Sequence, residues 1–345
     1  MDEKIISLLR SPKTRGKLHL REELIEGENI VSGILYDSHG NEFKIVDSIP
    51  RFVTQTSGNT INSFSYKWKT FVNASLQQQE RNKIIFLDHY GFTLNKFKEF
   101  LSTRKRILDA GCGTGYISNW IHSETTDSQV FGIDISTSVE EARKHFCHNN
   151  KKELNYLQSD ISELPFEDNF FDMIVCKEVI HHTPKPRENF SKLVKLLVPG
   201  GSIMIYVYKK KGPIREFCDD YLRSHTTKLN VDECHKFAES MTELGRSLRQ
   251  AKININVPKD IPYLNIKAGE YDLQRFIYWN IFKCWWDDEG DKEYSDAINF
   301  DWYHPEHAFR YTEDEIKKWF EEEGLQIDNF NVLEAGIAVR GTKIK

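Results

Sequence analysis

The residue types best suited to chemistry gather in a short segment from Asp109 to Gly115. Asp109 closes a run of apolar residues, and glycines follow at every second position, at 111, 113 and 115. Glycine permits a sharp turn and lets the backbone approach a ligand where a Cβ atom would collide. A helical pattern begins at Tyr116, and the free N–H groups at a helix start bind anionic ligands. The segment therefore predicts a nucleotide-type binding loop.

The spacing of these glycines narrows the ligand. A dinucleotide loop follows G-x-G-x-x-G, whereas here the third glycine comes one residue early and Tyr116 takes its usual place. The pattern D-x-G-x-G-x-G resembles the first motif of the class I S-adenosylmethionine (SAM)-dependent methyltransferases. A second apolar strand over 130–134 ends in Asp134, in the position where an acid accepts hydrogen bonds from ribose hydroxyls. A third strand ends in Asp160, where the family reads the adenine amino group. Order and spacing match the family from about residue 104 to 210.

The resemblance implies SAM as the cofactor. The residues that it assigns to the cofactor are Asp109, Gly111, Gly113, Gly115, Asp134, Ile135, Asp160, Ile161, Lys177 and Tyr66. Tyr66 stands apart, on a helical pattern at 63–71 whose aromatic residues either pack on the sheet domain or help to close the cofactor pocket.

Two histidines follow the fourth predicted strand, which covers residues 171–176. Methyl transfer needs a base only if the acceptor loses a proton as it attacks, and an imidazole suits that role near neutral pH. His181 and His182 are therefore candidate catalytic residues, with a purely structural role at a helix start as the alternative for His182. Tyr303 and His304 are further candidates. We expect no metal, because no third ligand accompanies His304 and His307.

The surrounding pattern predicts the fold that positions these residues. A fifth strand is expected over 202–208, and a helix with a Thr312–Glu315 capping box precedes two closing strands over 325–333 and 337–341. A second capping box is expected at Ser138–Glu141. By resemblance the fold is α/β, a doubly wound sheet of seven strands with one antiparallel strand, a small N-terminal β-rich domain and a helical cap insertion.

The first 55 residues predict a separate small unit. Segments 8–14, 16–18, 36–40 and 49–52 resemble the zinc-ribbon-like module of the tRNA-methyltransferase activator subunit and its bacterial relatives. The four metal-ligand positions of that module fall here on Ser11, Thr14, Tyr36 and His39. A structural zinc site needs about four nitrogen or sulfur donors, so we predict a descendant without zinc.

The predicted domains are therefore the β-rich unit (1–55), a linker with aromatic helices (56–103), the SAM-binding domain (104–211 and 306–345) and the substrate cap (212–305). The cap is dense in aromatic residues, most of which form its own core while a minority line a pocket. The basic run 209–211 is either a solvated strand end or a contact for a phosphate or carboxylate of the acceptor.

Composition agrees with this organisation. The 345 residues are 39% hydrophobic with a net charge of −5, which argues against a large nucleic-acid footprint. No window has the ~18 apolar residues of a membrane span, and the first residues do not resemble a signal peptide. Six scattered cysteines fit a reducing cytoplasm.

These features favour a cytoplasmic SAM-dependent methyltransferase acting on an oxygen or nitrogen of a small molecule. The resemblance implies carbohydrate or natural-product biosynthesis, with a sugar, a nucleotide sugar or a secondary metabolite as acceptor. Two alternatives stay open: an RNA or protein methyltransferase, and a non-catalytic scaffold with a SAM fold. A homo-oligomer is compatible with the sequence.

Overall fold

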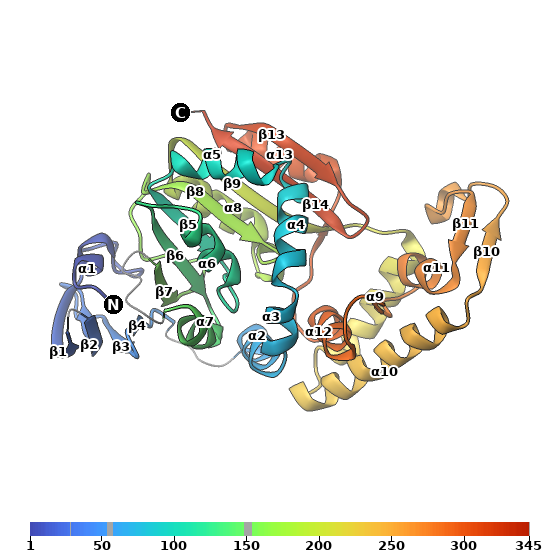
Figure 1. Cartoon of the computed structure of the whole chain (residues 1–345), viewed down its shortest axis with the longest axis horizontal. Helices are drawn as coiled ribbons and strands as arrows, with labels where there is room; N and C mark the ends of the chain where they lie inside the picture. The colour runs from blue at the N-terminus through green and yellow to red at the C-terminus, as the bar shows by residue number, and fades with distance from the viewer. Residues whose placement is uncertain (28, 54–57, 148–153, 345) are drawn as a thin grey trace. The chain divides into compact units, whose positions relative to one another are not determined.

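The computed structural model describes residues 1–27, 29–53, 58–147 and 154–344. The chain folds into two compact units (Figure 1). Unit 1 comprises residues 1–56, 81–208 and 311–345, and unit 2 comprises residues 57–80 and 209–310. The four predicted domain boundaries stay a prediction, and each unit is described by itself.

Unit 1 is built on a mixed sheet with the order β13-β14-β9-β8-β5-β6-β7. All neighbours from β9 to β7 are parallel, whereas β14 is antiparallel to both β9 and β13. This confirms the predicted seven-stranded α/β sheet with one antiparallel strand. The strands are β5 (Arg106–Ala110), β6 (Gln129–Asp134), β7 (Leu154–Gln158), β8 (Phe171–Lys177), β9 (Leu197–Lys209), β13 (Leu325–Val332) and β14 (Gly336–Lys343), and the short β12 (Arg310–Tyr311) pairs with β9.

Helices cover both faces of this sheet, as a doubly wound fold requires. One apolar cluster joins the sheet to residues of α4, α5, α6 and α7, and a second joins it to α8 and α13. The bounds are α4 (Gln79–His89), α5 (Leu94–Ser102), α6 (Tyr116–Ser123), α7 (Ser138–Phe146), α8 (Pro186–Leu196) and α13 (Glu313–Glu322).

The two predicted capping boxes have different outcomes. Thr312 and Glu315 form a reciprocal capping box at α13, as predicted. The box at Ser138 is wrong, because the N-cap of α7 is Thr137 and its side chain makes no capping bond. The Ser138 hydroxyl instead accepts a hydrogen bond from Ser136 at 2.8 Å.

The N-terminal part of unit 1 is a small antiparallel sheet with the order β1-β2-β3-β4. Backbone bonds join it to the large sheet's surroundings, from Arg10 N to the Pro165 carbonyl at 2.9 Å and from Phe52 N to the Gln158 carbonyl at 2.8 Å. Its elements are α1 (Lys4–Leu8), β1 (His19–Glu26), β2 (Asn29–Tyr36), β3 (Glu42–Val46) and β4 (Ile49–Pro50).

A buried carboxylate organises the turns of this small sheet. Asp37 Oδ2 accepts hydrogen bonds from the hydroxyls of Ser11 (2.6 Å) and Thr14 (2.8 Å) and from the Asn41 amide (2.9 Å), and Oδ1 accepts from the backbone N–H groups of His39 and Asn41. Burial alone would raise the pKa of Asp37, but the bonds from Ser11, Asn41 and Thr14 hold it well below its usual range. Ser11, Thr14 and the turn at His39 are thus joined through a carboxylate.

Unit 2 is mainly helical and includes a two-stranded antiparallel hairpin, β10–β11. Its longest helix, α10, starts at a capping box of Asn230 and Glu233. The elements are α2 (Asn59–Thr70), α3 (Val72–Gln77), α9 (Pro213–Thr226), α10 (Val231–Gln250), β10 (Asn254–Val257), the 3₁₀ turn η2 (Pro262–Leu264), β11 (Gly269–Asp272), α11 (Leu273–Asn280) and α12 (Lys292–Tyr303).

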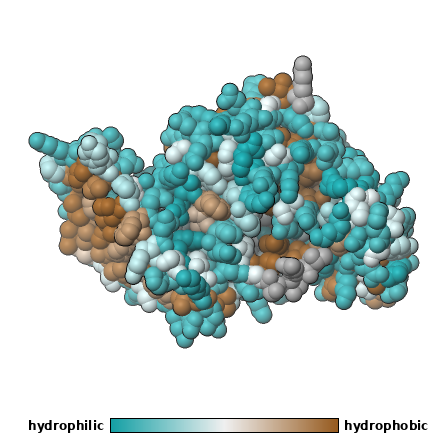
Figure 2. Space-filling model, turned by 180° about the vertical axis from the view of Figure 1, so that it is seen from behind, coloured by the Kyte–Doolittle hydropathy of each residue, from teal (hydrophilic) through white to brown (hydrophobic). Residues whose placement is uncertain are grey.

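Unit 2 carries much of the exposed apolar surface, and Figure 2 shows it as a brown patch over this unit. Within unit 2 the most exposed large hydrophobic side chains are Tyr263 at 94%, Phe217 at 73% and Tyr221 at 60%.

Candidate functional site

The glycine loop joins β5 to α6 in a conformation that requires glycine. Gly111, Gly113 and Gly115 have φ angles of +85°, +53° and +78°. Residues with a Cβ rarely adopt this left-handed region. The N–H groups of Gly111 and Cys112 both donate to the Ile133 carbonyl at 2.8 Å, so the loop is fixed to the neighbouring strand β6.

Close packing adds a second reason for glycine at two of these positions. A Cβ atom on Gly111 would lie 2.3 Å from a methyl group of Val179. A Cβ atom on Gly115 would lie 2.5 Å from the Tyr156 hydroxyl and 2.6 Å from Ala142 Cβ. Glycine at these two positions is therefore required by packing within the chain as well as by the backbone conformation.

Asp134, the last residue of β6, holds the same loop. Its Oδ2 accepts the Gly113 N–H at 3.0 Å, and its Oδ1 accepts both the N–H and the hydroxyl of Ser136 at 2.9 and 2.6 Å. A carboxylate offers about four acceptor sites, so three are used within the chain and one is left for a ligand donor. The acid is buried, which strengthens each of these bonds.

Asp109, the predicted acid at the end of β5, lies beneath the loop. The Ser118 hydroxyl donates to its Oδ2 at 2.6 Å. Burial raises the pKa of Asp109 to about 6, and the bonds from Ser118 offset only part of that effect. A positive group near Asp109 would favour its ionised form.

Asp160 follows β7 at the same edge of the sheet. Its Oδ1 accepts the Ser162 N–H at 2.7 Å, which closes a turn and fixes the carboxylate. Asp160 is partly exposed, the next residue Ile161 is buried, and Ile135, after β6, is partly exposed. An acceptor flanked by apolar side chains suits a flat base with an exocyclic amine.

The end of β8 carries a feature that the sequence did not indicate. Glu178 has φ of +62°, a strained value for a residue with a side chain. Its carboxylate is paired with the predicted site residue Lys177. Strain of this kind clusters at functional sites, and here it turns the chain from β8 towards the histidines.

The two predicted histidines lie on the short 3₁₀ turn η1 (Ile180–His182) directly after β8. Both are buried, at 0% and 2% exposure. Their ring centroids are 4.3 Å apart, and the His181 ring lies 3.9 Å from that of Tyr208 at the end of β9. The structure therefore brings His181, His182 and a tyrosine together at the carboxyl edge of β8 and β9.

His89 of α4 is a histidine that the sequence analysis missed. Its ring stacks on Tyr206 with centroids 5.1 Å apart. Burial, assisted by Lys177, lowers the pKa of His89 to about 4, so the imidazole is neutral at physiological pH. No local motif indicates His89, because its neighbours Lys177 and Tyr206 come from strands more than 80 residues further along the chain.

The remaining predicted site residues lie in unit 2. The Tyr303 hydroxyl donates to the Lys283 carbonyl at 2.6 Å, and His304 contacts the Ser63 hydroxyl at 2.6 Å through Nδ1. The Tyr66 hydroxyl lies 2.8 Å from His235 Nδ1. These bonds join helices within unit 2, and the roles predicted for Tyr303, His304 and Tyr66 stay predictions.

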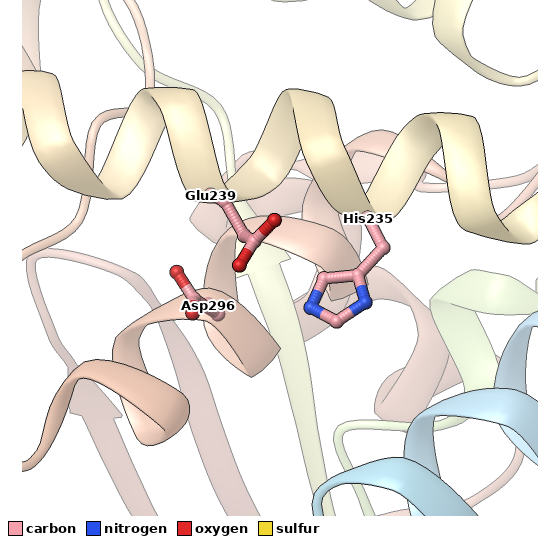
Figure 3. Close-up of side chains that lie close together, drawn as sticks. All are labelled: His235, Glu239 and Asp296. Atoms are coloured by element: carbon pink, nitrogen blue, oxygen red, sulfur yellow. The ribbon is translucent and has the colours of Figure 1, made fainter.

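One group in unit 2 has the residue types of a metal site. His235 and Glu239, one turn apart on α10, face Asp296 on α12, and their potential ligand atoms lie within 4.8 Å of one another (Figure 3). The Lys292 ammonium, however, already contacts Asp296 at 2.7 Å and Glu239 at 3.3 Å. The group is a charge-paired contact between two helices, and the expected absence of a metal stays a prediction.

Comparison with known proteins agrees with this geometry. Residues 108–205 match the family model described as a methyltransferase domain. The ubiquinone biosynthesis O-methyltransferase of Coxiella burnetii (strain Dugway 5J108-111) is 31% identical over 191 residues, which are 52% of this chain and 76% of that protein. The namesake from Rickettsia conorii is 30% identical over 185 residues, 53% of this chain and 62% of the relative. The chain therefore spans less than two thirds of that second relative.

Among solved structures, magnesium protoporphyrin IX methyltransferase of Synechocystis PCC 6803 with bound SAH is similar at a TM-score of 0.41 and 14% identity, covering 80% of this chain and 86% of that one. The parallel strands β5, β6 and β7, with acids at or just after their carboxyl ends, define a nucleotide-binding α/β protein of the doubly wound class. The matched methyltransferase domain and the 31% identical relative from Coxiella burnetii show that the chain belongs to the SAM-dependent methyltransferases.

The residues present fit SAM as the cofactor. The glycine loop leads into the first turn of α6, Asp134 retains acceptor capacity, and Asp109 is a buried acid whose raised pKa a nearby cation such as the SAM amino group would lower. No helix in the described part of the chain has both the length and the apolar content for a bilayer span.

Proposed function

We propose that this protein transfers a methyl group from SAM to an oxygen or nitrogen of a small molecule, with a hydroxyl as the favoured acceptor. The observation that supports it most is the buried His181–His182 pair on the turn after β8, in the same unit as the glycine loop. The relatives named O-methyltransferases support oxygen as the acceptor atom.

The proposed mechanism asks little of the side chains. SAM supplies a methyl carbon that is already electrophilic. Orientation of the acceptor contributes most of the barrier lowering, roughly 7–11 kcal/mol for well-placed groups. His182 receives the proton that a hydroxyl loses as its oxygen attacks, and the His181 ring, packed between His182 and Tyr208, holds that imidazole in place.

The proposal includes the class of acceptor and the cellular compartment. We propose a sugar, a nucleotide sugar or a secondary metabolite as the methyl acceptor and the cytoplasm as the compartment. The N-terminal sheet is proposed as a zinc-free relative of the activator-subunit module, in which the Asp37 carboxylate joins the turns that zinc joins elsewhere. A homo-oligomer formed through the exposed apolar surface of unit 2 is tested by light scattering, which would give twice the monomer mass.

The test uses SAM carrying an isotopically labelled methyl group. The protein is incubated with small-molecule, peptide and RNA fractions, and the label is followed by mass spectrometry. We expect label in the small-molecule fraction only, at the mass of an acceptor in which one labelled methyl group has replaced a hydrogen. Label in RNA or peptide would select the corresponding alternative. Binding of SAM without transfer to any fraction would favour a scaffold and overturn the enzymatic proposal.

A further inference from the structure

We propose that unit 2 contains a binding site for an anionic group, a carboxylate or a phosphate. The site is a cluster of cations set among aromatic rings, hereafter the cap cation cluster. Its members are Lys211, Arg215, Lys283, Tyr278, Trp279 and Trp302. The inference rests on the proposed function in taking the bound molecule to be the methyl acceptor.

The cations of the cap cation cluster lie against ring faces. The Lys283 ammonium is 5.0 Å from the centre of the Trp302 ring, and the Lys211 ammonium is 5.2 Å from that of Trp279. The Arg215 guanidinium lies 5.2 Å from the Tyr278 ring and 5.4 Å from the Trp302 ring. Such contacts stabilise a cation but do not neutralise it.

Lys283 is the decisive member. It is 6% exposed, and its ammonium has no ion pair or hydrogen bond among the residues that the structure describes. A buried charge without a counterion is strongly disfavoured. A protein keeps such a lysine chiefly where a ligand supplies the missing negative charge.

The carboxylates near Lys283 are engaged elsewhere. Asp219 accepts the Arg215 Nε at 2.5 Å, and Asp301 accepts the Lys67 ammonium at 2.7 Å. The Asp219 Oδ1 is the exception, since it is buried with no hydrogen-bond partner in the described structure. A direct Lys283–Asp219 ion pair is therefore the competing interpretation that the experiment has to separate.

The lowered pKa values of Lys283 and Lys211 agree with an anion-binding site formed by these two side chains. Burial lowers the pKa of Lys283 to about 7; Asp301 and Asp219 act to raise it, whereas Arg215 and Lys67 lower it further. Burial likewise lowers the pKa of Lys211 to about 7, with Arg215, Lys209 and Lys283 adding to the effect and Glu216 opposing it. An arriving anion would raise both values, so binding near pH 7 would take up protons.

The partial exposure of Lys211 gives the anion a way in. Lys211 and Trp279 are both partly exposed, whereas Arg215 and Lys283 are buried behind them. Lys211 also belongs to the basic run 209–211, for which the sequence left two alternatives, a solvated strand end or a contact for a phosphate or carboxylate. The sequence could not show Lys283, because its role depends on burial.

The test is calorimetric titration of the full-length protein, without SAM, using benzoate, phenyl phosphate and the uncharged isostere benzamide. We expect saturable binding of benzoate or phenyl phosphate, at least about tenfold tighter than benzamide. Comparing buffers of different ionisation enthalpy should reveal uptake of roughly half a proton or more at pH 7. Whichever anion binds more tightly identifies the headgroup.

Variants make the result specific. Lys283→Met should weaken the anion at least about tenfold while leaving the melting temperature equal or higher, because an uncompensated buried charge is removed. The matched control Lys267→Gln removes an exposed lysine of the same unit, paired with Asp260, and should leave binding unchanged. Equal affinity for benzoate and benzamide, or a Lys283→Met protein that melts earlier and binds normally, would assign Lys283 to Asp219 and overturn the proposal.

These outcomes are separate from those of the proposed function. Anion binding is measured without SAM or turnover, so its failure leaves methyl transfer untouched. Conversely, a protein that binds benzoate through Lys283 but transfers no methyl group would contradict the proposed function alone.

Discussion

Replacing Asp134 by alanine should weaken SAM binding without unfolding the protein. The carboxylate accepts three hydrogen bonds within the chain, from the Gly113 N–H and from both donors of Ser136. By our assignment it also accepts a ribose hydroxyl. A hydrogen bond to a charged group contributes about 1.5–3 kcal/mol, and each 1.4 kcal/mol is tenfold in affinity. The SAM dissociation constant should therefore rise about 10- to 100-fold.

The matched control is Asp172→Ala. Asp172 also holds backbone N–H groups of the same sheet, those of Lys105 at 2.7 Å and Arg106 at 3.2 Å, but at the amino end of β5. Its loss should lower the free energy of unfolding and leave the dissociation constant within about twofold. Titration calorimetry with SAM on both folded variants gives the comparison. An unchanged constant for Asp134→Ala, or an equal loss in Asp172→Ala, would refute the assignment.

Four further predictions concern the loop, the histidines and the small sheet. Gly115→Ala and Gly200→Ala both place alanine at φ of +78°, but only the Cβ atom at position 115 would meet neighbouring atoms within 4 Å. Denaturant unfolding should therefore show that Gly115→Ala lowers the free energy of unfolding by about 1–3 kcal/mol more than Gly200→Ala. Equal losses of stability would contradict the packing described for Gly115. His182→Ala should lower turnover about 10²–10⁴-fold with a hydroxyl acceptor while the SAM dissociation constant stays constant; near-parental turnover would make His182 structural. Asp37→Ala should destabilise the small sheet most at neutral pH and progressively less below about pH 4, because a carboxyl whose folded pKa is depressed contributes its full stability above its unfolded pKa and loses it as the pH falls towards the folded value. Metal analysis of protein purified without chelator should find less than about 0.2 equivalents of zinc, and a stoichiometric zinc would overturn the zinc-free assignment.

The sequence predicted the sheet well because its signals are local. A short apolar run followed by an acid marks a buried parallel strand and its carboxyl end. Strand β6 ends at Asp134 as predicted, whereas β5 ends one residue after Asp109 and β7 ends two residues before Asp160. The glycine spacing likewise predicted three residues that all adopt positive φ. The closing helix and hairpin followed from a capping box and two strand patterns.

What the sequence did not predict depends on distant partners. The Asp37 carboxylate accepts hydrogen bonds from Ser11 and Thr14, which lie more than 20 residues earlier in the chain, and no sequence motif predicts this contact. His89 gains its lowered pKa from burial beside Tyr206 and Lys177. The sequence alone does not distinguish Lys283 from a surface lysine, because only the structure shows that its side chain is buried. Burial and strain are properties of the assembled fold, so a single sequence leaves them undetermined.

A structure determined with bound S-adenosylhomocysteine would show where the cofactor lies. We expect the ribose hydroxyls within hydrogen-bond distance of Asp134, the adenine amine beside Asp160, and the sulfur facing the turn that carries His181 and His182. A cofactor bound away from the 109–115 loop, or a ribose held by a different acid, would contradict this expectation.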